Sequence, residues 1–284
     1  LDRGRVSRVE VDHAGTTERI HAERVVLSAG VYHSPQLLEL SGIGRPEELR
    51  EHGIPVRHEL PGVGEGYQDH AVVYLTYQGT SELRDEDVIP KVRLILSSTG
   101  DQARPDLHVF LRPSIRMAGA PALLPISVHL LEHRSRGRVR LASTDASDLP
   151  IVEPALLEHP ADVEALVAGI GLVDTLVRHP RLARFYGDLL TPASMADVET
   201  HVRTTFETYH HGVGTCRLGP PDDRLAVVGA DLRVHGIRNL WVGDASVLPT
   251  IPHANTNLAA ILVGEAAARR VRGLEPAPTA VGAA

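Results

Sequence analysis

Val25-Val26-Leu27-Ser28-Ala29-Gly30 is a short apolar run that ends in three small residues. Such a run predicts a strand buried on both faces, and the small residues after it permit a tight turn. Ser34-Pro35 then has the pattern of a helix N-cap with proline at the first helical position, and a mostly apolar segment follows at residues 36–40. These residues therefore predict strand, turn and helix, which is one piece of an α/β layer.

A hairpin is predicted on the N-terminal side of this run. Residues 5–11 alternate between polar and apolar with period two, and residues 18–27 return after a turn that contains Gly15. The chain starts at Leu1 rather than at methionine, and the strand pattern begins at once. We therefore expect the sequence to begin in the middle of a domain.

The central part of the chain changes character. Residues 42–70 are rich in glycine and proline and predict a long irregular loop with a short helix near 47–51. After it come four strand signals, which predict a mainly antiparallel sheet with one face open to a cavity and a turn at Gly137. The four signals lie at residues 71–77, 106–111, 126–131 and 138–141.

Helical patterns and a second α/β segment follow. Apolar residues at helical spacing predict a helix over 161–178 that His179-Pro180 stops, and another helix near 196–204 that starts from Thr191 or Ser194. A core strand is then predicted at 240–242 and a helix of small residues at 257–271. We expect the Pro- and Ala-rich tail to be disordered.

Composition excludes several classes of protein. With 284 residues, 43% hydrophobic and 23% charged, the chain is of ordinary globular type and long enough for a buried core. It has no apolar run long enough for a membrane span, and we expect a cytoplasmic protein. Its net charge of −7 does not favour nucleic acid, and its single cysteine, Cys216, excludes a disulfide framework or a multi-cysteine zinc site.

Two polar segments near the C-terminus are candidates for chemistry. Tyr209-His210-His211-Gly212-Val213-Gly214 carries two histidines, the side chains that exchange protons near neutral pH, and glycines that let the backbone pass close to a flat ligand. Residues 243–257 follow the predicted core strand and lead to a helix N-terminus, where α/β proteins place ligands. A surface loop with solvated histidines, and an ordinary connection capped by Asn255 or Thr256, have the same patterns, so both interpretations stay open.

His129-Leu130-Leu131-Glu132-His133 matches the H-x-x-E-H pattern of a zinc hydrolase. That pattern requires a helix, whereas Pro125 and Gly137 flank a segment that is predicted to be a strand. Two histidines four residues apart on a strand lie too far apart to share one ion, at about 3.3 Å per residue. We therefore predict no metal site.

Five stretches, taken in order, resemble the glucose–methanol–choline (GMC) family of FAD-dependent oxidoreductases. The resemblance rests on residues 26–44, on Leu60-Pro61-Gly62-Val63-Gly64 with Gln68-Asp69-His70, on Ser135-Arg136-Gly137, and on the segments of His211 and Asn255. The Gly-x-Gly-x-x-Gly phosphate loop of that family is absent from this sequence. The chain therefore resembles the C-terminal half of such an enzyme.

The resemblance implies a role for each matching position. His211 would be the catalytic base that takes the substrate hydroxyl proton beside the flavin of FAD, and Asn255 would orient the substrate oxygen. Two pairs would contact the cofactor. They are Asp244 and Ala245 near the ribityl-phosphate region, and Thr256 and Asn257 near the isoalloxazine ring.

The resemblance also implies a mixed α+β and α/β fold: part of a Rossmann-like FAD domain, and a substrate domain with a mainly antiparallel sheet. The expected divisions are a partial FAD domain (1–68), a substrate domain (69–205), a returning FAD-domain segment (206–272) and a disordered tail (273–284). The implied function is hydride transfer from the CH–OH group of a small alcohol to FAD, with the ADP-binding half absent or supplied by another chain. The alternative is a non-catalytic remnant or assembly subunit.

Overall fold

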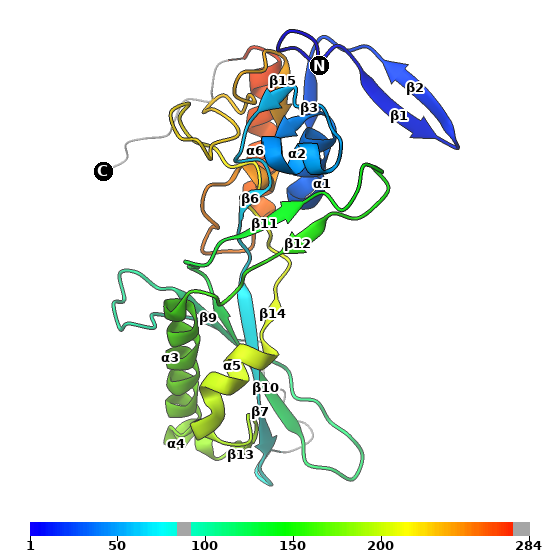
Figure 1. Cartoon of the computed structure of the whole chain (residues 1–284). Helices are drawn as coiled ribbons and strands as arrows, with labels where there is room; N and C mark the ends of the chain where they lie inside the picture. The colour runs from blue at the N-terminus through cyan, green and yellow to red at the C-terminus, as the bar shows by residue number, and fades with distance from the viewer. Residues whose placement is uncertain (84–91, 275–284) are drawn as a thin grey trace. The chain divides into compact units, whose positions relative to one another are not determined.

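A computed structural model describes residues 1–83 and 92–274. The chain divides into two compact units, each collected from segments that are distant in sequence (Figure 1). Unit 1 contains residues 1–68, 136–155 and those from 211 onward, and unit 2 contains the described residues of 69–135 and 156–210. Residues 136–155 thus join unit 1, an assignment that the local sequence pattern does not indicate. The tail predicted to be disordered from residue 273 lies almost wholly outside the described residues.

Unit 2 is built on an antiparallel sheet with the strand order β13-β7-β10-β9-β8, and β14 pairs with the start of β7. Three of the predicted strands are confirmed here, because β7, β9 and β10 coincide with the strand signals at residues 71–77, 106–111 and 126–131. The strands are β7 (Ala71–Gly79), β8 (Val92–Leu96), β9 (Leu107–Leu111), β10 (Leu123–Leu130), β13 (Tyr186–Thr191) and β14 (Glu207–Thr208).

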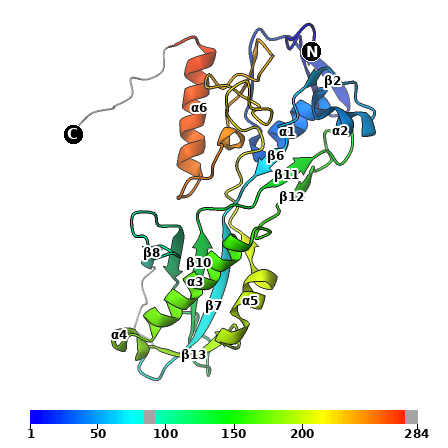
Figure 2. The same ribbon diagram turned by 60° about the vertical axis from the view of Figure 1, so that its left-hand side comes forward.

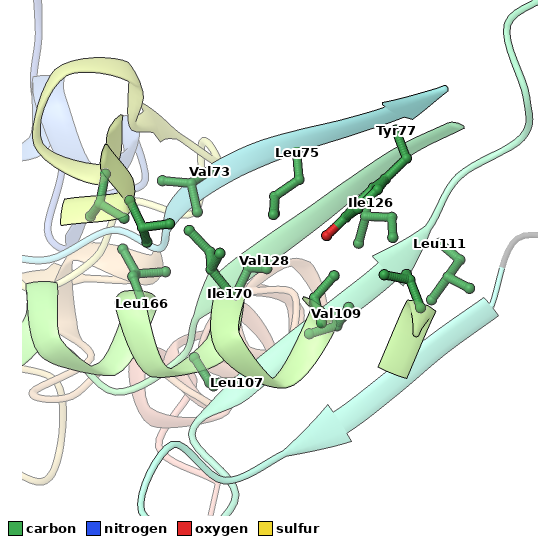
Figure 3. Close-up of a cluster of buried hydrophobic side chains, with 14 of the residues drawn as sticks. Val73, Leu75, Tyr77, Leu107, Val109, Leu111, Ile126, Val128, Leu166 and Ile170 are labelled. Atoms are coloured by element: carbon green, nitrogen blue, oxygen red, sulfur yellow. The ribbon is translucent and has the colours of Figure 1, made fainter. Parts of the chain in front are cut away.

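One face of this sheet carries the core of unit 2. Helix α3 (Pro160–Val177) lies along it, as Figure 2 shows, and confirms the helix predicted from periodicity. Leu166 and Ile170 of α3 pack among Val73, Leu75 and other side chains of the sheet (Figure 3). The approach is close at Gly169, where an added Cβ would lie 2.8 Å from Val128. Burial of this face supplies the main hydrophobic stabilisation of the unit.

Shorter helices complete unit 2. Helix α4 (Pro180–Ala183) follows α3, and a 3₁₀ turn at Met195–Asp197 leads into α5 (Val198–Thr205). The Ser194 side chain accepts a hydrogen bond from the Ala196 amide, so Ser194 is the start signal of this helical segment.

Unit 1 is a set of short elements. A parallel pair of strands joins segments more than 200 residues apart, β3 (Val25–Leu27) and β15 (Leu240–Val242). A second sheet has the order β12-β11-β6. The other elements are β1 (Val9–His13), β2 (Thr16–Ile20), α1 (Gly30–Leu40), β4 (Ile43–Gly44), α2 (Pro46–Glu51), β5 (His58–Glu59), β6 (Glu65–Tyr67), β11 (Gly137–Arg140), β12 (Ile151–Glu153), a 3₁₀ turn at Ala245–Val247, and α6 (Asn257–Val271).

These elements confirm much of the predicted pattern and correct parts of it. The hairpin, the helix near 47–51, the strand at 240–242 and the helix at 257–271 are all present. The loop predicted over 42–70 also contains three short strands. Gly137 does not turn β10 into β11, because β11 pairs with β12 and β6 instead. Glycine is required there for another reason: an added Cβ would lie 2.3 Å from the Glu153 carbonyl oxygen.

Two further predictions for residues 25–40 are wrong. Strand β3 is not buried on both faces, because Val26 is 40% exposed. Ser34 is not the N-cap of α1, which begins four residues earlier at Gly30 and contains Pro35 in its interior. The local rule failed because contacts with distant segments stabilise the first turn of α1, as described below.

Unit 1 also exposes large apolar side chains. Leu258, Ile261 and Leu262, on α6, are between 54% and 67% exposed. Neither α6 nor any other helix in the two described ranges combines the length and the apolar character that crossing a membrane requires. The described part of unit 1 therefore leaves one side of α6 uncovered.

Candidate active site

His211 and Asn255 lie together in unit 1, although 44 residues separate them in sequence. The Asn255 amide nitrogen Nδ2 is 3.1 Å from Nε2 of His211. With the amide donating, Nε2 of the imidazole is the acceptor and carries no proton, which is the state that a base requires. Asn255 is exposed and His211 is half-buried, so the pair faces the surface of unit 1.

Backbone geometry fixes the segment that carries His211. The preceding residue, His210, has a left-handed backbone conformation with φ of 59°. It is exposed, and its amide donates to the Thr208 hydroxyl oxygen. The backbone is therefore not extended at His210, and His211 is the histidine of the two that pairs with Asn255. Further along, Gly214 has φ of 97°, and an added Cβ would lie 2.4 Å from the Gly66 carbonyl oxygen.

Gln68 connects the two loops that carry His211 and Asn255. Its backbone exchanges two hydrogen bonds with Val213, at 3.0 and 2.9 Å. Its side-chain amide donates to the Pro249 carbonyl and accepts from the Ile251 amide. Gln68 is only 1% exposed, so these bonds form in a buried site where an unmade bond is costly. We infer that Gln68 holds the two loops in register. The sequence analysis included Gln68 in the family resemblance but did not predict this structural role.

Asp244 uses its carboxylate to cap α1 from a distant part of the chain. Oδ2 accepts from the Gly30 amide at 3.0 Å and from the Ser34 hydroxyl at 2.5 Å. Oδ1 accepts from the Ser246 amide at 2.8 Å. A carboxylate at a helix N-terminus also interacts favourably with the helix dipole. This explains why α1 starts at Gly30: the cap comes from residue 244 and not from Ser34.

Pro35 in the interior of α1 has a partner in the His211 loop. Proline has no N–H, so the Val31 carbonyl loses its usual helical donor. The Thr215 hydroxyl donates to this carbonyl at 2.6 Å and replaces the missing bond. Thr215 is fully buried. The loop that carries His211 is thereby attached to α1, a contact that no local sequence pattern indicates.

The predicted cofactor-contacting residues lie near the N-terminus of α6 and after β15. Thr256 is the N-cap residue of α6, but its side chain makes no capping hydrogen bond. Thr256 is buried, and Asn257 at the first helical position is exposed. A helix start without a side-chain cap has amide donors available for an acceptor. The contacts predicted for Asp244, Ala245, Thr256 and Asn257 with a cofactor stay predictions.

Glu39 is a buried carboxyl in the same unit, and sequence reasoning missed it. It is 3% exposed, and burial raises its pKa to about 8, with repulsion from Glu48 in the same direction. The Arg140 guanidinium opposes this shift. Glu39 is therefore protonated at neutral pH and acts as a neutral hydrogen-bonding group.

The H-x-x-E-H segment lies in unit 2 and is not helical. His129 belongs to β10 and contacts the Ser127 hydroxyl at 2.9 Å, while His133 Nε2 accepts from the Ala71 amide. Across residues 1–83 and 92–274, no group of three or more histidine, cysteine, aspartate or glutamate side chains is arranged to hold a metal ion.

Comparison with known proteins identifies the family. Residues 133–264 match the family model for the C-terminal part of GMC oxidoreductases, and residues 2–72 match the model for the N-terminal part. The chain belongs to the GMC oxidoreductase family. The mixed α/β fold and the antiparallel sheet of unit 2 agree with this assignment.

Curated GMC relatives include enzymes named for choline and for alcohols. The chain is 34% identical to oxygen-dependent choline dehydrogenase 1 of Chromohalobacter salexigens, a match that covers 96% of this chain and 55% of the relative. It is 34% identical to choline oxidase of Arthrobacter globiformis, over 95% of this chain and 52% of that one. Alcohol dehydrogenase [acceptor] of Pseudomonas putida is 31% identical, with 86% and 50% covered. The chain thus spans about half the length of the curated relatives it matches.

Two solved structures of oxidases share the fold. Pyridoxine 4-oxidase from Mesorbium loti superposes with a TM-score of 0.85 at 25% identity, covering 97% of this chain and 56% of that one. Formate oxidase from Aspergillus oryzae, in a study of FAD modification, has a TM-score of 0.80 at 23% identity, with 94% and 57% covered. The second likeness shows the fold alone.

Proposed function

We propose that this chain provides the substrate domain and the acid–base residues of an FAD-dependent oxidoreductase that oxidises the CH–OH group of a small alcohol. The observation that carries the proposal is the 3.1 Å contact between His211 and Asn255, two polar side chains brought together from separate loops. Membership of the GMC oxidoreductase family supports it.

The residues of unit 1 fit one end of FAD. The first amides of α6 have no side-chain cap, and they would favour the electron-rich pyrimidine edge of a flavin. Thr256 and Asn257 would hold that edge, and Asp244 with Ala245 would border the ribityl-phosphate region. Bound FAD supplies the hydride acceptor of the reaction.

His211 and Asn255 would then perform the acid–base chemistry. Nε2 of His211 takes the hydroxyl proton as the alcohol carbon becomes a carbonyl carbon. The Asn255 amide donates to the substrate oxygen, where negative charge develops. Substrate binding exchanges the direct Asn255–His211 hydrogen bond for bonds from both groups to the substrate hydroxyl, and Gln68 and Thr215 would keep the two loops in place during this exchange.

The ADP moiety would be held by a part of the flavin domain outside the matched half. The uncovered face of α6 supports this proposal, because Leu258, Ile261 and Leu262 form an apolar stripe of the kind that another element covers. We propose that a flavin-domain segment, in the same polypeptide or in a separate chain, packs against this stripe.

The catalytic assignment is tested in an FAD-loaded assembly of this chain with such a segment. His211→Ala should slow flavin reduction by about 10²–10⁴-fold in stopped-flow measurements, the usual contribution of a positioned base. The flavin spectrum should not change. His210→Ala is the matched control, because that histidine is the exposed neighbour that is not paired with Asn255, and reduction should proceed at the original rate. Equal rates in wild type and His211→Ala would contradict the assignment.

The proposed assembly is tested by the visible absorbance of bound FAD. The chain mixed with the N-terminal half of a GMC relative should retain FAD through gel filtration, and Leu258→Ser with Ile261→Ser should abolish retention. Leu149→Ser is the control, since Leu149 is 76% exposed in the same unit but is not part of α6. A colourless protein under every condition would favour the non-catalytic remnant.

A further inference from the structure

The side of the unit 2 sheet that carries α3 also borders a cavity of about 420 Å³. This volume is within the range of small-molecule sites, about 300–1,000 Å³. The walls of the cavity come from β7, the C-terminal end of α3, α4 and β13. All of these elements belong to unit 2, so the cavity is formed within one unit.

The cavity has an apolar, aromatic floor and a polar opening. Tyr77, Val177 and Tyr186 form the floor and are 2%, 3% and 7% exposed. The two tyrosine rings meet edge to face, with their centres 5.8 Å apart. Arg178 and Asp188 line the same cavity but are exposed, so one positive and one negative side chain border its opening. This arrangement suits a ligand that buries an aromatic ring.

An irregularity in the edge strand β13 lies beside the cavity. Tyr186 pairs with Gly79, and Leu189 pairs with Tyr77. Three steps along β13 therefore match two steps along β7, which leaves one extra residue of β13 within 187–188. A bulge of this kind bends its strand and changes the direction of side chains, and bulges are frequent beside functional sites. Both residues of the bulged segment line the cavity.

The Tyr77 hydroxyl is a buried polar group in this floor. Figure 3 shows the Tyr77 side chain within the cluster that packs against α3. Among the described residues, neither its hydroxyl oxygen nor Oδ1 of Asp174 has a hydrogen-bond partner of normal geometry. The two groups are neighbours, because burial and then the charge of Asp174 raise the pKa of Tyr77 to about 12. Tyr77 thus keeps its proton at neutral pH and offers a donor, while Asp174 offers an acceptor.

A ligand hydroxyl group complements this donor and acceptor. It can accept from Tyr77 and donate to Asp174, which gives both buried groups a partner. A carboxylate has no proton to donate, and its burial beside Asp174 would bring two negative charges together. Arg178 does not remove this obstacle, since its Nε already donates to Oδ2 of Asp174 at 2.7 Å. A ring without a polar group would leave both groups unsatisfied.

We propose that this cavity is a binding site for a neutral phenol. The ring of the ligand packs against Tyr77 and Tyr186, and its hydroxyl joins the Tyr77 hydroxyl to the Asp174 carboxylate. Helix α4 and the bulged segment of β13 border the opening through which the ligand enters. The residues involved lie within unit 2, so the site stands or fails separately from the proposed function.

Isothermal titration of the 284-residue chain with three matched probes tests the ligand class. The probe para-cresol carries the ring and the hydroxyl, toluene lacks the hydroxyl, and para-toluate has a carboxylate in its place. We expect saturable binding of para-cresol at one site, binding of toluene that is weaker by about three- to tenfold, and no binding of para-toluate. Absence of para-cresol binding, or binding of either other probe as tight as that of para-cresol, would overturn the proposal.

Tyrosine variants then locate the hydrogen bond. Tyr77→Phe removes the hydroxyl and keeps the ring, so it should weaken para-cresol binding by about three- to tenfold and leave toluene binding unchanged. Tyr74→Phe is the matched control, because it makes the same substitution on the same strand at a half-buried residue that does not line the cavity. Circular dichroism verifies folding of each variant. Unchanged para-cresol affinity in Tyr77→Phe, or an equal loss in Tyr74→Phe, would refute the assignment.

A substitution that fills the cavity provides an independent test. Ala183 lines the cavity from α4 and is exposed, so Ala183→Trp can occupy the space without altering the core. It should abolish binding of both para-cresol and toluene. Leu172→Trp is the control, since Leu172 is 40% exposed on α3 and does not line the cavity. Retention of para-cresol binding in Ala183→Trp would place the ligand elsewhere and refute the proposal.

Discussion

Unit 2 and unit 1 achieve their folds in different ways. In unit 2, contiguous strands and one long helix bury a continuous apolar cluster, with Leu166, Ile170 and Val173 of α3 essentially inaccessible. In unit 1, the strands are two to five residues long, and the segments come from three separated parts of the chain. Unit 2 is organised by one continuous apolar cluster, whereas unit 1 combines its own buried apolar cluster with polar contacts between distant segments.

Three buried polar side chains of unit 1 form contacts that span long sequence distances. Asp244 caps α1, Thr215 replaces the donor that Pro35 lacks, and Gln68 joins two loops. Each of these groups is buried, so each bond is costly to break. Unit 1 also has a buried apolar cluster, to which Cys216 of the His211 loop and Val247 contribute. The comparison therefore indicates that the His211–Asn255 pair depends on long-range polar contacts in addition to apolar burial.

Truncating matched leucines should give the largest contrast between the units. Leu166→Ala, in the core of unit 2, should lower the free energy of unfolding by about 3 kcal/mol, because a buried leucine is replaced by a cavity. Leu258→Ala, on the uncovered side of α6 in unit 1, should change it by less than about 0.5 kcal/mol. Urea denaturation followed by circular dichroism measures both.

One result would contradict this contrast between the two units. If Leu258→Ala destabilised the chain as much as Leu166→Ala, the α6 stripe would already be covered in this protein, and the comparison of a closed core with an open face would be wrong. Leu149→Ala, another exposed leucine of unit 1, provides the baseline for a harmless truncation.

Glu39 should make the stability of unit 1 depend on pH. Its folded pKa is raised from 4.5 to about 8 by burial. Between these values the unfolded chain releases a proton that the folded chain keeps, so stability falls as pH rises from 4.5 to 8. Glu39→Gln keeps a neutral group and should remove this loss, on the order of 4 kcal/mol at pH 8.

The measurement is denaturation of both proteins at pH 5 and pH 8. Wild type should lose stability relative to Glu39→Gln at the higher pH and should match it at the lower one. Glu47→Gln, an exposed first-turn residue of α2, is the control and should follow the wild-type profile. Parallel profiles for wild type and Glu39→Gln would show that Glu39 is ionised in the folded protein.

The same contrast explains which features could be predicted from the sequence. The strands and the long helix of unit 2 follow from alternation and helical spacing, because local pattern and burial agree there. The start of α1 was misjudged because Ser34-Pro35 imitates a cap, while the true cap is Asp244. Burial of β3 was misjudged because a short apolar run does not reveal what covers it.

The candidate site shows the same limit. His211 and Asn255 could be proposed from a family resemblance, and their proximity is a fact of the fold. Gln68, Thr215 and Glu39 could not be assigned roles, because their partners lie up to about 180 residues away and no periodic pattern connects them.

Thr215 and Pro35 can be tested as a pair. Thr215→Val removes the hydroxyl that donates to the Val31 carbonyl and should cost about 1–2 kcal/mol of unfolding free energy. Pro35→Ala restores a backbone N–H that can bond the same carbonyl, so Thr215→Val should cost less in the Pro35→Ala background. Thr215→Ser keeps the hydroxyl and is the control. Strictly additive effects in this double-mutant cycle would contradict the link between α1 and the His211 loop.

The smallest effect is expected at His210, where the chain passes from unit 2 to unit 1. Its φ of 59° is unfavourable for any residue with a Cβ, whereas glycine adopts it freely. His210→Gly should therefore leave stability unchanged or raise it by up to about 1 kcal/mol, because relief of this conformation offsets the greater entropy of glycine in the unfolded chain. His52→Gly is the matched control, since His52 has φ of −87° and gains nothing from glycine, so it should lose about 0.5–1 kcal/mol. Thermal unfolding of the two variants compares them directly, and an equal loss in both would mean that His210 does not hold the left-handed conformation that turns the chain toward His211.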